Sequence, residues 1–208
     1  MEIAVLADIH GNLIALEAVL KDIEENKIDQ IIVLGDMITD FPDNTNTILN
    51  MIKQKAQYII KGNRETYLLS ADMKFREYKQ FLSISKTYDA ISSDNLKFIS
   101  SLPEQISIVY DSSFSFDQWY KKINDKIIVN PGSVGINFSG SKTAQYAIIN
   151  YENGIASIVL KDVVYDFERL KSKYNQNNSW NTLWPIPNNV WDDLFKEWSK
   201  KNDKDEHR

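Results

Sequence analysis

The sequence MEIAVLADIHGN, residues 1–12, decides the fold of this chain. Its first six residues are mostly apolar and rich in β-favouring types, which predicts a buried strand. The strand ends in the loop of residues 8–12, and a helical pattern follows at once, with Asn12 placed to cap its first turn. Ligands of open α/β sheets bind at the carboxyl ends of strands, so we expect Asp8 and His10 to lie at such an edge. Two side chains of these types at this spacing can face one metal ion.

The same arrangement occurs twice more along the chain. Residues 30–34 form a second buried-strand pattern, which ends in Gly35 and Asp36. Residues 57–61 form a third, which is followed by Gly62, Asn63, Arg64 and Glu65. Parallel strands joined by right-handed helical crossovers would bring these three ends to one edge of the sheet. An Asp-x-His triplet alone is a weak signal, but its recurrence with other polar strand ends predicts a site.

Length and composition are typical of a soluble globular protein. The 208 residues allow one α/β domain with a small appendage. A formal net charge of −5 argues against a general binder of nucleic acid or anionic membrane. The absence of cysteine excludes disulfides, zinc–thiolate sites and cysteine nucleophiles. The sequence shows no basic leader and no apolar run of membrane-spanning length, so we expect a cytoplasmic protein.

The remaining patterns divide the chain into a domain over residues 1–165 and a Trp-rich helical extension over residues 166–208. The domain contains a helical insert at about residues 65–102. Further helices are predicted at residues 13–27 and around residues 48–52. The later strand patterns, of which the last two form an antiparallel pair, are residues 106–110, 118–122, 126–129, 146–150 and 155–164.

Two aromatic-rich regions leave alternatives open. The insert aromatics are predicted to pack over the sheet edge, and the alternative is a pocket wall for an aromatic or apolar substrate group. These aromatics are Tyr67, Phe75, Tyr78 and Phe81. A helix over residues 188–201, which includes Trp191 and Trp198, is predicted to dock on the domain or to form a homo-oligomer contact. His207 in the charged tail is expected to take no part in a site.

These motifs resemble those of the calcineurin-like metallophosphoesterases, especially the small bacterial and archaeal phosphodiesterase-type branch. The resemblance spans residues 1 to about 165, and it rests on Asp8-x-His10, Gly35-Asp36, Gly62-Asn63 and Asn130-Pro131-Gly132-Ser133. It implies an α/β fold of the α+β sandwich type, in which central sheets are flanked by helices.

The resemblance also implies a pair of divalent metal ions. Asp8 and His10 would bind the first ion, Asp36 would bridge both, and Asn63 would bind the second. Mn²⁺ is the first candidate, and Fe, Zn²⁺ and Ni are the others. Two such ions would activate water for in-line attack on a small phosphorylated substrate or a phosphoprotein.

The chain departs from the family pattern in two respects. Family members carry three further histidines, one in a His-Gly turn and two in a Gly-His-x-His turn, whereas this chain has only His10 and His207. Residues 113–116 (SFSF) stand where the second turn would fall, and most of the segment before it is absent, so we expect a gap or re-paired strands in the sheet. One metal ion, or none, is therefore an alternative to two.

The second departure is Arg64, which stands where many members have a histidine. Arginine does not release its proton near neutral pH, so it would clamp the phosphate together with Asn63 rather than act as an acid. Glu65 is an alternative ion-pair partner for Arg64 at the helix start. Three functions follow: a metal-dependent phosphoesterase, an impaired phosphoesterase fold that binds a phosphorylated ligand or protein partner, and an assembly module acting through the Trp-rich helix.

Overall fold

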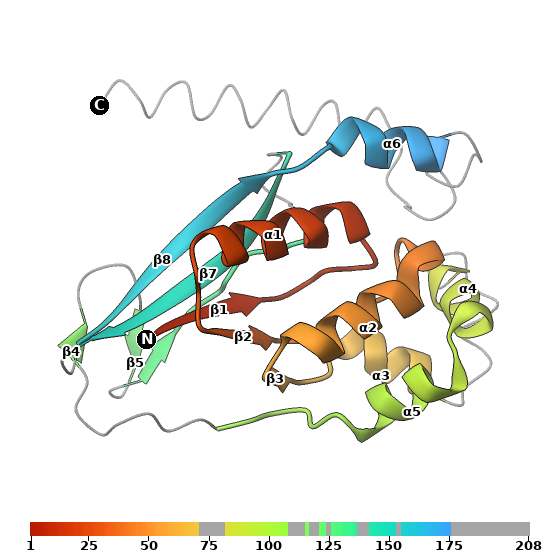
Figure 1. Cartoon of the computed structure of the whole chain (residues 1–208). Helices are drawn as coiled ribbons and strands as arrows, with labels where there is room; N and C mark the ends of the chain where they lie inside the picture. Colours follow the sequence, from red (N-terminus) through yellow and green to blue (C-terminus); the bar gives the residue numbers. More distant parts are fainter. Residues whose placement is uncertain are drawn as a thin grey trace.

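The computed structural model places six strands in one mixed sheet, in the order β3-β2-β1-β7-β8-β4 (Figure 1). The strands β1 (Glu2–Leu6), β2 (Gln30–Val33) and β3 (Tyr58–Ile59) run parallel to one another, as predicted. The hairpin of β7 (Thr143–Glu152) and β8 (Ile155–Val164) joins this group through an antiparallel β1–β7 ladder. The short strand β4 (Ser115–Phe116) pairs in parallel with the start of β8.

The structure describes residues 1–70, 82–107, 115–116, 121–123, 126–136, 142–152 and 155–175. Several predicted features lie outside these ranges: the insert aromatics Phe75, Tyr78 and Phe81, half of the SFSF segment, His207, and the Trp-rich helix over residues 188–201. The predicted strand over residues 106–110 is described only at its first two residues, which belong to no strand.

The helices follow the strands in the predicted alternation. They are α1 (Leu13–Glu25), the 3₁₀ turn η1 (Pro42–Asn44), α2 (Thr45–Lys55), α3 (Asn63–Leu69), α4 (Leu82–Ala90), α5 (Ser93–Ser101) and α6 (Phe167–Asn175). A separate antiparallel pair is formed by β5 (Lys121–Ile123) and β6 (Lys126–Ile128). In the part of the chain that the structure describes, no helix is long and apolar enough to span a membrane.

Strand β1 lies at the centre of the sheet because both of its faces are apolar. Ala4 and Leu6 belong to the main core, which α1 and α2 cover, and Ile3 and Val5 face a second cluster on the opposite side. β7 lies directly beside β1, so the sheet is continuous through the six described strands. The carboxyl ends of β1, β2 and β3 therefore share one edge.

Asn12 fixes the loop that follows β1. Its side-chain oxygen accepts a hydrogen bond from the Ala15 amide at 3.1 Å, which caps α1 as predicted. Its amide nitrogen donates to the Gly135 carbonyl at 2.8 Å, so the same side chain ties this loop to residues 131–136. Two loops far apart in sequence are thereby held together beside the strand end.

The first helix of the C-terminal region packs against the domain. Leu170 and Tyr174 of α6 form a small buried cluster with Phe41 and Ile136. The rings of Phe41 and Tyr174 are 4.8 Å apart between centroids. Phe41, the member of this cluster in the loop that leads from β2 to α2, directly follows Asp40 in the sequence.

Candidate metal centre

Asp8, His10 and Asp36 come together at the carboxyl ends of β1 and β2. One ligand atom from each side chain lies within 4.8 Å of the other two, as the strand order predicts. All three residues adopt left-handed backbone angles, with φ of 55°, 50° and 51°. Such angles cost a non-glycine residue of order 1–3 kcal/mol, and they are concentrated at functional sites. The backbone is thus strained at all three predicted metal ligands.

Backbone hydrogen bonds hold the first two loops in register. The His10 amide donates to the Asp36 carbonyl at 2.9 Å, and the Gly11 amide donates to the Met37 carbonyl at 3.0 Å. The third loop approaches closely because Gly35, with φ of +87°, has no side chain: a Cβ there would collide with the Gly62 backbone. The glycine before Asp36 therefore allows the loop that carries Asn63 to reach the site.

Asn63 completes the set of four predicted ligands around Asp36. With its amide oxygen toward the Asp36 carboxylate, acceptors face each other, an arrangement that a divalent cation beside both would stabilise. With the amide reversed, its nitrogen donates to Asp36 Oδ2 at 2.6 Å and to Oδ1 at 2.9 Å. The Arg64 backbone amide also donates to Asp36 Oδ1 at 2.9 Å. Asp36 is thus the point at which the second and third loops meet.

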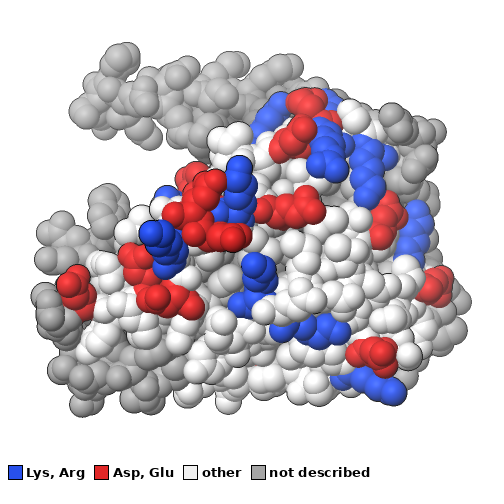
Figure 2. Space-filling view, in the orientation of Figure 1, with Lys and Arg blue, Asp and Glu red and all other residues white. Residues whose placement is uncertain are grey.

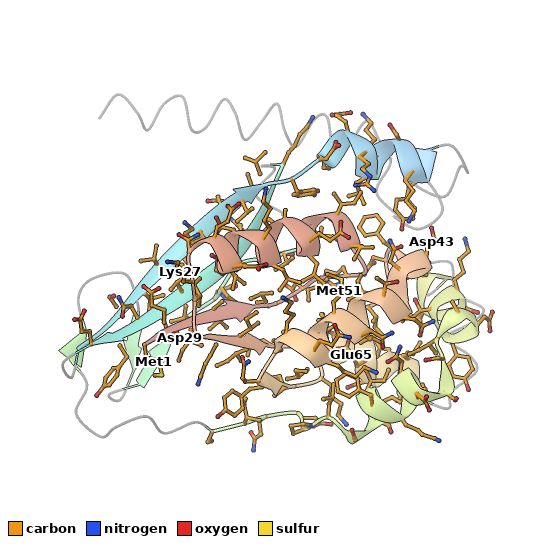
Figure 3. The ribbon with its side chains drawn as sticks, in the orientation of Figure 1. Met1, Lys27, Asp29, Asp43, Met51 and Glu65 are labelled. Atoms are coloured by element: carbon orange, nitrogen blue, oxygen red, sulfur yellow. The ribbon has the colours of Figure 1, made fainter. Side chains whose placement is uncertain are left out.

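The Glu65 carboxylate links the loop of Asp36 to the loop of Gly62. It does not form the ion pair with Arg64 that the sequence leaves open. Its carboxylate, 0% exposed, accepts backbone N–H bonds from Asp36 at 2.9 Å, Met37 at 2.8 Å and Gly62 at 2.8 Å. Burial raises the pKa of Glu65, and the hydrogen bonds from the backbone oppose that rise. Figure 3 labels Glu65 near α2 and α3. A glutamate three residues after a helix cap is a known capping signal, and it could have predicted this role.

Arg64 lies beside the cluster with its guanidinium partly accessible. Its Nη2 atom is 3.6 Å from Oδ1 of Asp40, and its side chain is 24% exposed. The other oxygen of Asp40 lies 2.9 Å from His10 Nδ1. Asp40 was not among the residues predicted from the sequence. It stands in a loop whose shape no local pattern indicates.

The Asn-Pro-Gly-Ser motif supports the first loop. Ser133 Oγ donates to the Asp8 carbonyl at 3.1 Å, and the Gly135 amide donates to the same carbonyl at 2.8 Å. The Val134 amide donates to the Ala7 carbonyl at 3.0 Å. These bonds fix the backbone at Asp8. Ser133 of the motif and the two residues that follow it therefore position a predicted metal ligand.

The donor set fits a divalent cation. Two carboxylates, an imidazole and an amide oxygen suit Mn²⁺, Fe and Zn²⁺. Asp8, His10 and Asp36 form the one cluster of metal-binding geometry within the described ranges. A second ion would have Asp36 and Asn63 as its donors among the predicted residues. His207, the other histidine of the chain, lies outside the described residues.

The electrostatics of Asp8 predict that metal binding depends on pH. Burial raises the pKa of Asp8 above its ordinary value of 3.8, Asp36 adds to the rise, and His10 and Arg64 oppose it. A cation favours the ionised carboxylate and competes with the proton, so Mn²⁺ affinity should weaken as pH falls through this raised pKa. Calorimetric titration in two buffers of different ionisation enthalpy would reveal the released protons. Affinity that stays constant between neutral and acidic pH would contradict this coupling.

Known proteins resemble this chain over different extents. Uncharacterized protein MJ0912 of Methanocaldococcus jannaschii is 37% identical over 103 residues, which are 49% of this chain and 42% of that protein. The match thus spans less than half the length of that relative.

Two solved structures share the fold at low sequence identity. A metallophosphoesterase from Sphaerobacter thermophilus has a TM-score of 0.67 and 18% identity, over 93% of this chain and 98% of that one. Hypothetical protein PH1004 from Pyrococcus horikoshii has a TM-score of 0.68 and 17% identity, over 93% and 97%. At these identities the likeness shows the fold alone, and the predicted fold class is confirmed.

A sequence model of the calcineurin-like phosphoesterases matches residues 1–205. The match covers nearly the whole chain, including the three loops that hold Asp8, His10, Asp36 and Asn63. The family comprises metal-dependent phosphoesterases, in agreement with the donor cluster at the strand ends. The chain therefore belongs to the calcineurin-like phosphoesterase family.

Proposed function

We propose that this chain hydrolyses phosphate esters at the cluster of Asp8, His10, Asp36 and Asn63, and that Arg64 binds the phosphate. The observation that carries the proposal is the convergence of the Asp8, His10 and Asp36 donors within 4.8 Å. The partner would be a small phosphorylated substrate or a phosphoprotein. Surface charge is mixed on the face in Figure 2, where acidic and basic side chains alternate over the described elements.

Each side chain has a role that follows from its position. Asp8 and His10 would hold a divalent ion, with Asp36 and Asn63 as further donors toward it and toward any second ion. When bound, Mn²⁺ or a similar ion polarises phosphoryl oxygens and makes water a better nucleophile near neutral pH. Arg64 keeps its charge at all working pH values and offers two parallel N–H groups to phosphate. The proton for the leaving group would come from water, since arginine does not supply one.

The direct test is hydrolysis of p-nitrophenyl phosphate and bis-p-nitrophenyl phosphate with Mn²⁺ and with chelator. The proposal expects release of nitrophenol that depends on added metal and stops with chelation. A preference between the two compounds would separate phosphatase from phosphodiesterase activity. Equal rates with metal and with chelator would contradict it.

Arg64→Ala should raise KM more than it lowers kcat. Hydrogen bonds to a charged group contribute about 1.5–3 kcal/mol, so the loss corresponds to a change of about 10–100-fold in KM. Arg64→Lys should recover only part of this, because lysine lacks the planar pair of donors. Steady-state kinetics on all three proteins measures the effect. A wild-type KM in Arg64→Ala would remove Arg64 from the phosphate site.

The histidine count supports a second candidate function. His10 is the only histidine in the described cluster, and the chain has two in all. In this alternative the fold binds a phosphorylated ligand or protein partner with at most one weak metal ion and no turnover. Calorimetric titration with Mn²⁺ and with inorganic phosphate separates the two. Two tight metal sites would exclude the alternative, and phosphate binding without hydrolysis would support it.

The proposed homo-oligomer contact through the Trp-rich helix stays a prediction, because residues 188–201 lie outside the described ranges. Sedimentation of the full chain, with Trp191→Ala plus Trp198→Ala as the comparison, is its test. A monomer that the substitutions leave unaltered would dismiss it.

A further inference from the structure

We propose that Asp40 is a positioning residue that acts on both halves of the site. One of its oxygens holds His10 with the proton on Nδ1, so that Nε2 is free to bind a metal, and the other holds the Arg64 guanidinium beside the cluster. The effect on catalysis rests on the proposed phosphoesterase function. The effect on His10 does not, and it can be measured without turnover.

Asp40 uses its two oxygens on different partners. Oδ2 lies 2.9 Å from His10 Nδ1, and Oδ1 lies 3.6 Å from Arg64 Nη2. Asp40 is 4% exposed and His10 is 5% exposed, so this contact is shielded from water. A buried carboxylate needs compensating partners, and His10, Arg64 and the Thr39 hydroxyl face this one.

The Nδ1 atom of His10 lacks a hydrogen bond that the nearby Asp40 carboxylate could accept. Although 2.9 Å from Asp40 Oδ2, it makes no aligned hydrogen bond with any described group. A buried ring nitrogen at this distance from a carboxylate gains most by carrying the proton and turning slightly toward it. The lone pair is then on Nε2, the remaining ring nitrogen. A ligating histidine held by a carboxylate through its other nitrogen is a stronger and better oriented ligand.

The backbone around Asp40 is built to keep the carboxylate in this place. Thr39 and Asp40 have positive φ angles of 80° and 26°, and the Thr39 hydroxyl donates to Asp40 Oδ2 at 3.0 Å. The Phe41 amide donates to the His10 carbonyl at 3.1 Å. Gly11 has φ of +78°, and a Cβ there would strike the carbonyls of Thr39 and Phe41. The loop that carries Asp40 is therefore pressed against the turn that carries His10.

The experiment is a long-range ¹H–¹⁵N spectrum of the histidine side chains in the metal-free full chain. His10 and His207 are the only histidines, and His207→Gln assigns the two signals. At about pH 9, well above the ordinary histidine pKa of about 6.5, the spectrum reports which nitrogen bears the proton. Wild type should show His10 mainly as the Nδ1–H tautomer. Asp40→Ala should shift it toward the mixture of a free imidazole and weaken Mn²⁺ binding by about 10–100-fold.

Two further variants keep the test decisive. Asp94→Asn removes a charge from an exposed side chain of α5, away from this loop, and should leave both readouts unchanged. If Asp40→Ala fails to fold, Asp40→Asn preserves the size of the side chain. Its single acceptor oxygen cannot serve His10 and Arg64 together, so a smaller shift in the same direction is expected.

The outcomes separate this proposal from the proposed function. An Nε2–H tautomer of His10 in wild type would overturn the role of Asp40, as would an unchanged tautomer in both Asp40 variants. The expected tautomer together with no hydrolysis by wild type would support that role and count against the phosphoesterase activity of this chain.

Discussion

Asp36→Ala is expected to abolish metal-stimulated hydrolysis of bis-p-nitrophenyl phosphate. Its carboxylate faces Asn63 and accepts a hydrogen bond from the Arg64 backbone amide at 2.9 Å. It also lies within 4.8 Å of the Asp8 and His10 donors, so the substitution removes the ligand that the other predicted donors surround. A metal ion supplies several kcal/mol of charge stabilisation, and a loss of 4 kcal/mol corresponds to about a thousandfold in kcat/KM. Assays with saturating Mn²⁺ distinguish lost activity from merely weaker binding.

Asp29→Ala is the matched control. Asp29 is an exposed carboxylate at the amino end of β2, and Figure 3 labels it at the side of the sheet away from α3. It accepts one hydrogen bond, from the Glu2 amide at 2.9 Å, which lies at the surface. We expect wild-type activity from this variant. Equal background rates in wild type and Asp36→Ala would mean that the cluster is not the active site.

Glu65→Ala is expected to lower the free energy of unfolding by about 3–5 kcal/mol, because it leaves one buried and two partly buried N–H groups without an acceptor. For a chain of this size the melting temperature should fall by about 10 °C. The loops of Asp36 and Gly62 would also lose their shared anchor, so Mn²⁺ affinity should drop in the same variant. Calorimetric melting of the metal-free protein measures the first effect without the second.

Glu25→Ala provides the comparison for this loss. Glu25 is an exposed residue of α1, 3.6 Å from Lys21 in an i,i+4 pair that contributes a few tenths of a kcal/mol. Glu65→Gln should fall between the two variants, because its amide keeps one acceptor oxygen and turns donors toward the remaining N–H groups. If Glu65→Ala melts at the same temperature as Glu25→Ala, the Glu65 carboxylate contributes no more to stability than a surface charge.

The elements that could be predicted are those whose signal is local. The apolar run of β1, the periodicity of α1 and the cap by Asn12 each depend on residues close in sequence, and the structure contains all three. The meeting of Asp8, His10 and Asp36 could also be predicted, because parallel strands align their carboxyl ends.

Asp40 and Glu65 could not be assigned in the same way. The place of Asp40 depends on two consecutive positive φ angles, which Thr39 and Asp40 adopt without a glycine to indicate them. The sequence offers Arg64 as a neighbouring ion-pair partner for Glu65, but the Glu65 carboxylate accepts hydrogen bonds from the Asp36 and Met37 amides across the sheet edge. Both contacts arise from tertiary structure, and side-chain type alone does not decide between a neighbouring cation and a distant amide.

The packing of α6 on Phe41 brings Tyr174 against the residue that follows Asp40 in the sequence. A protease cut or a binding partner that lifts this helix would uncover the Phe41 ring and release the backbone that aims Asp40 at the imidazole. Metal affinity would then respond to an event outside the metal site, transmitted through the packing of α6 on Phe41.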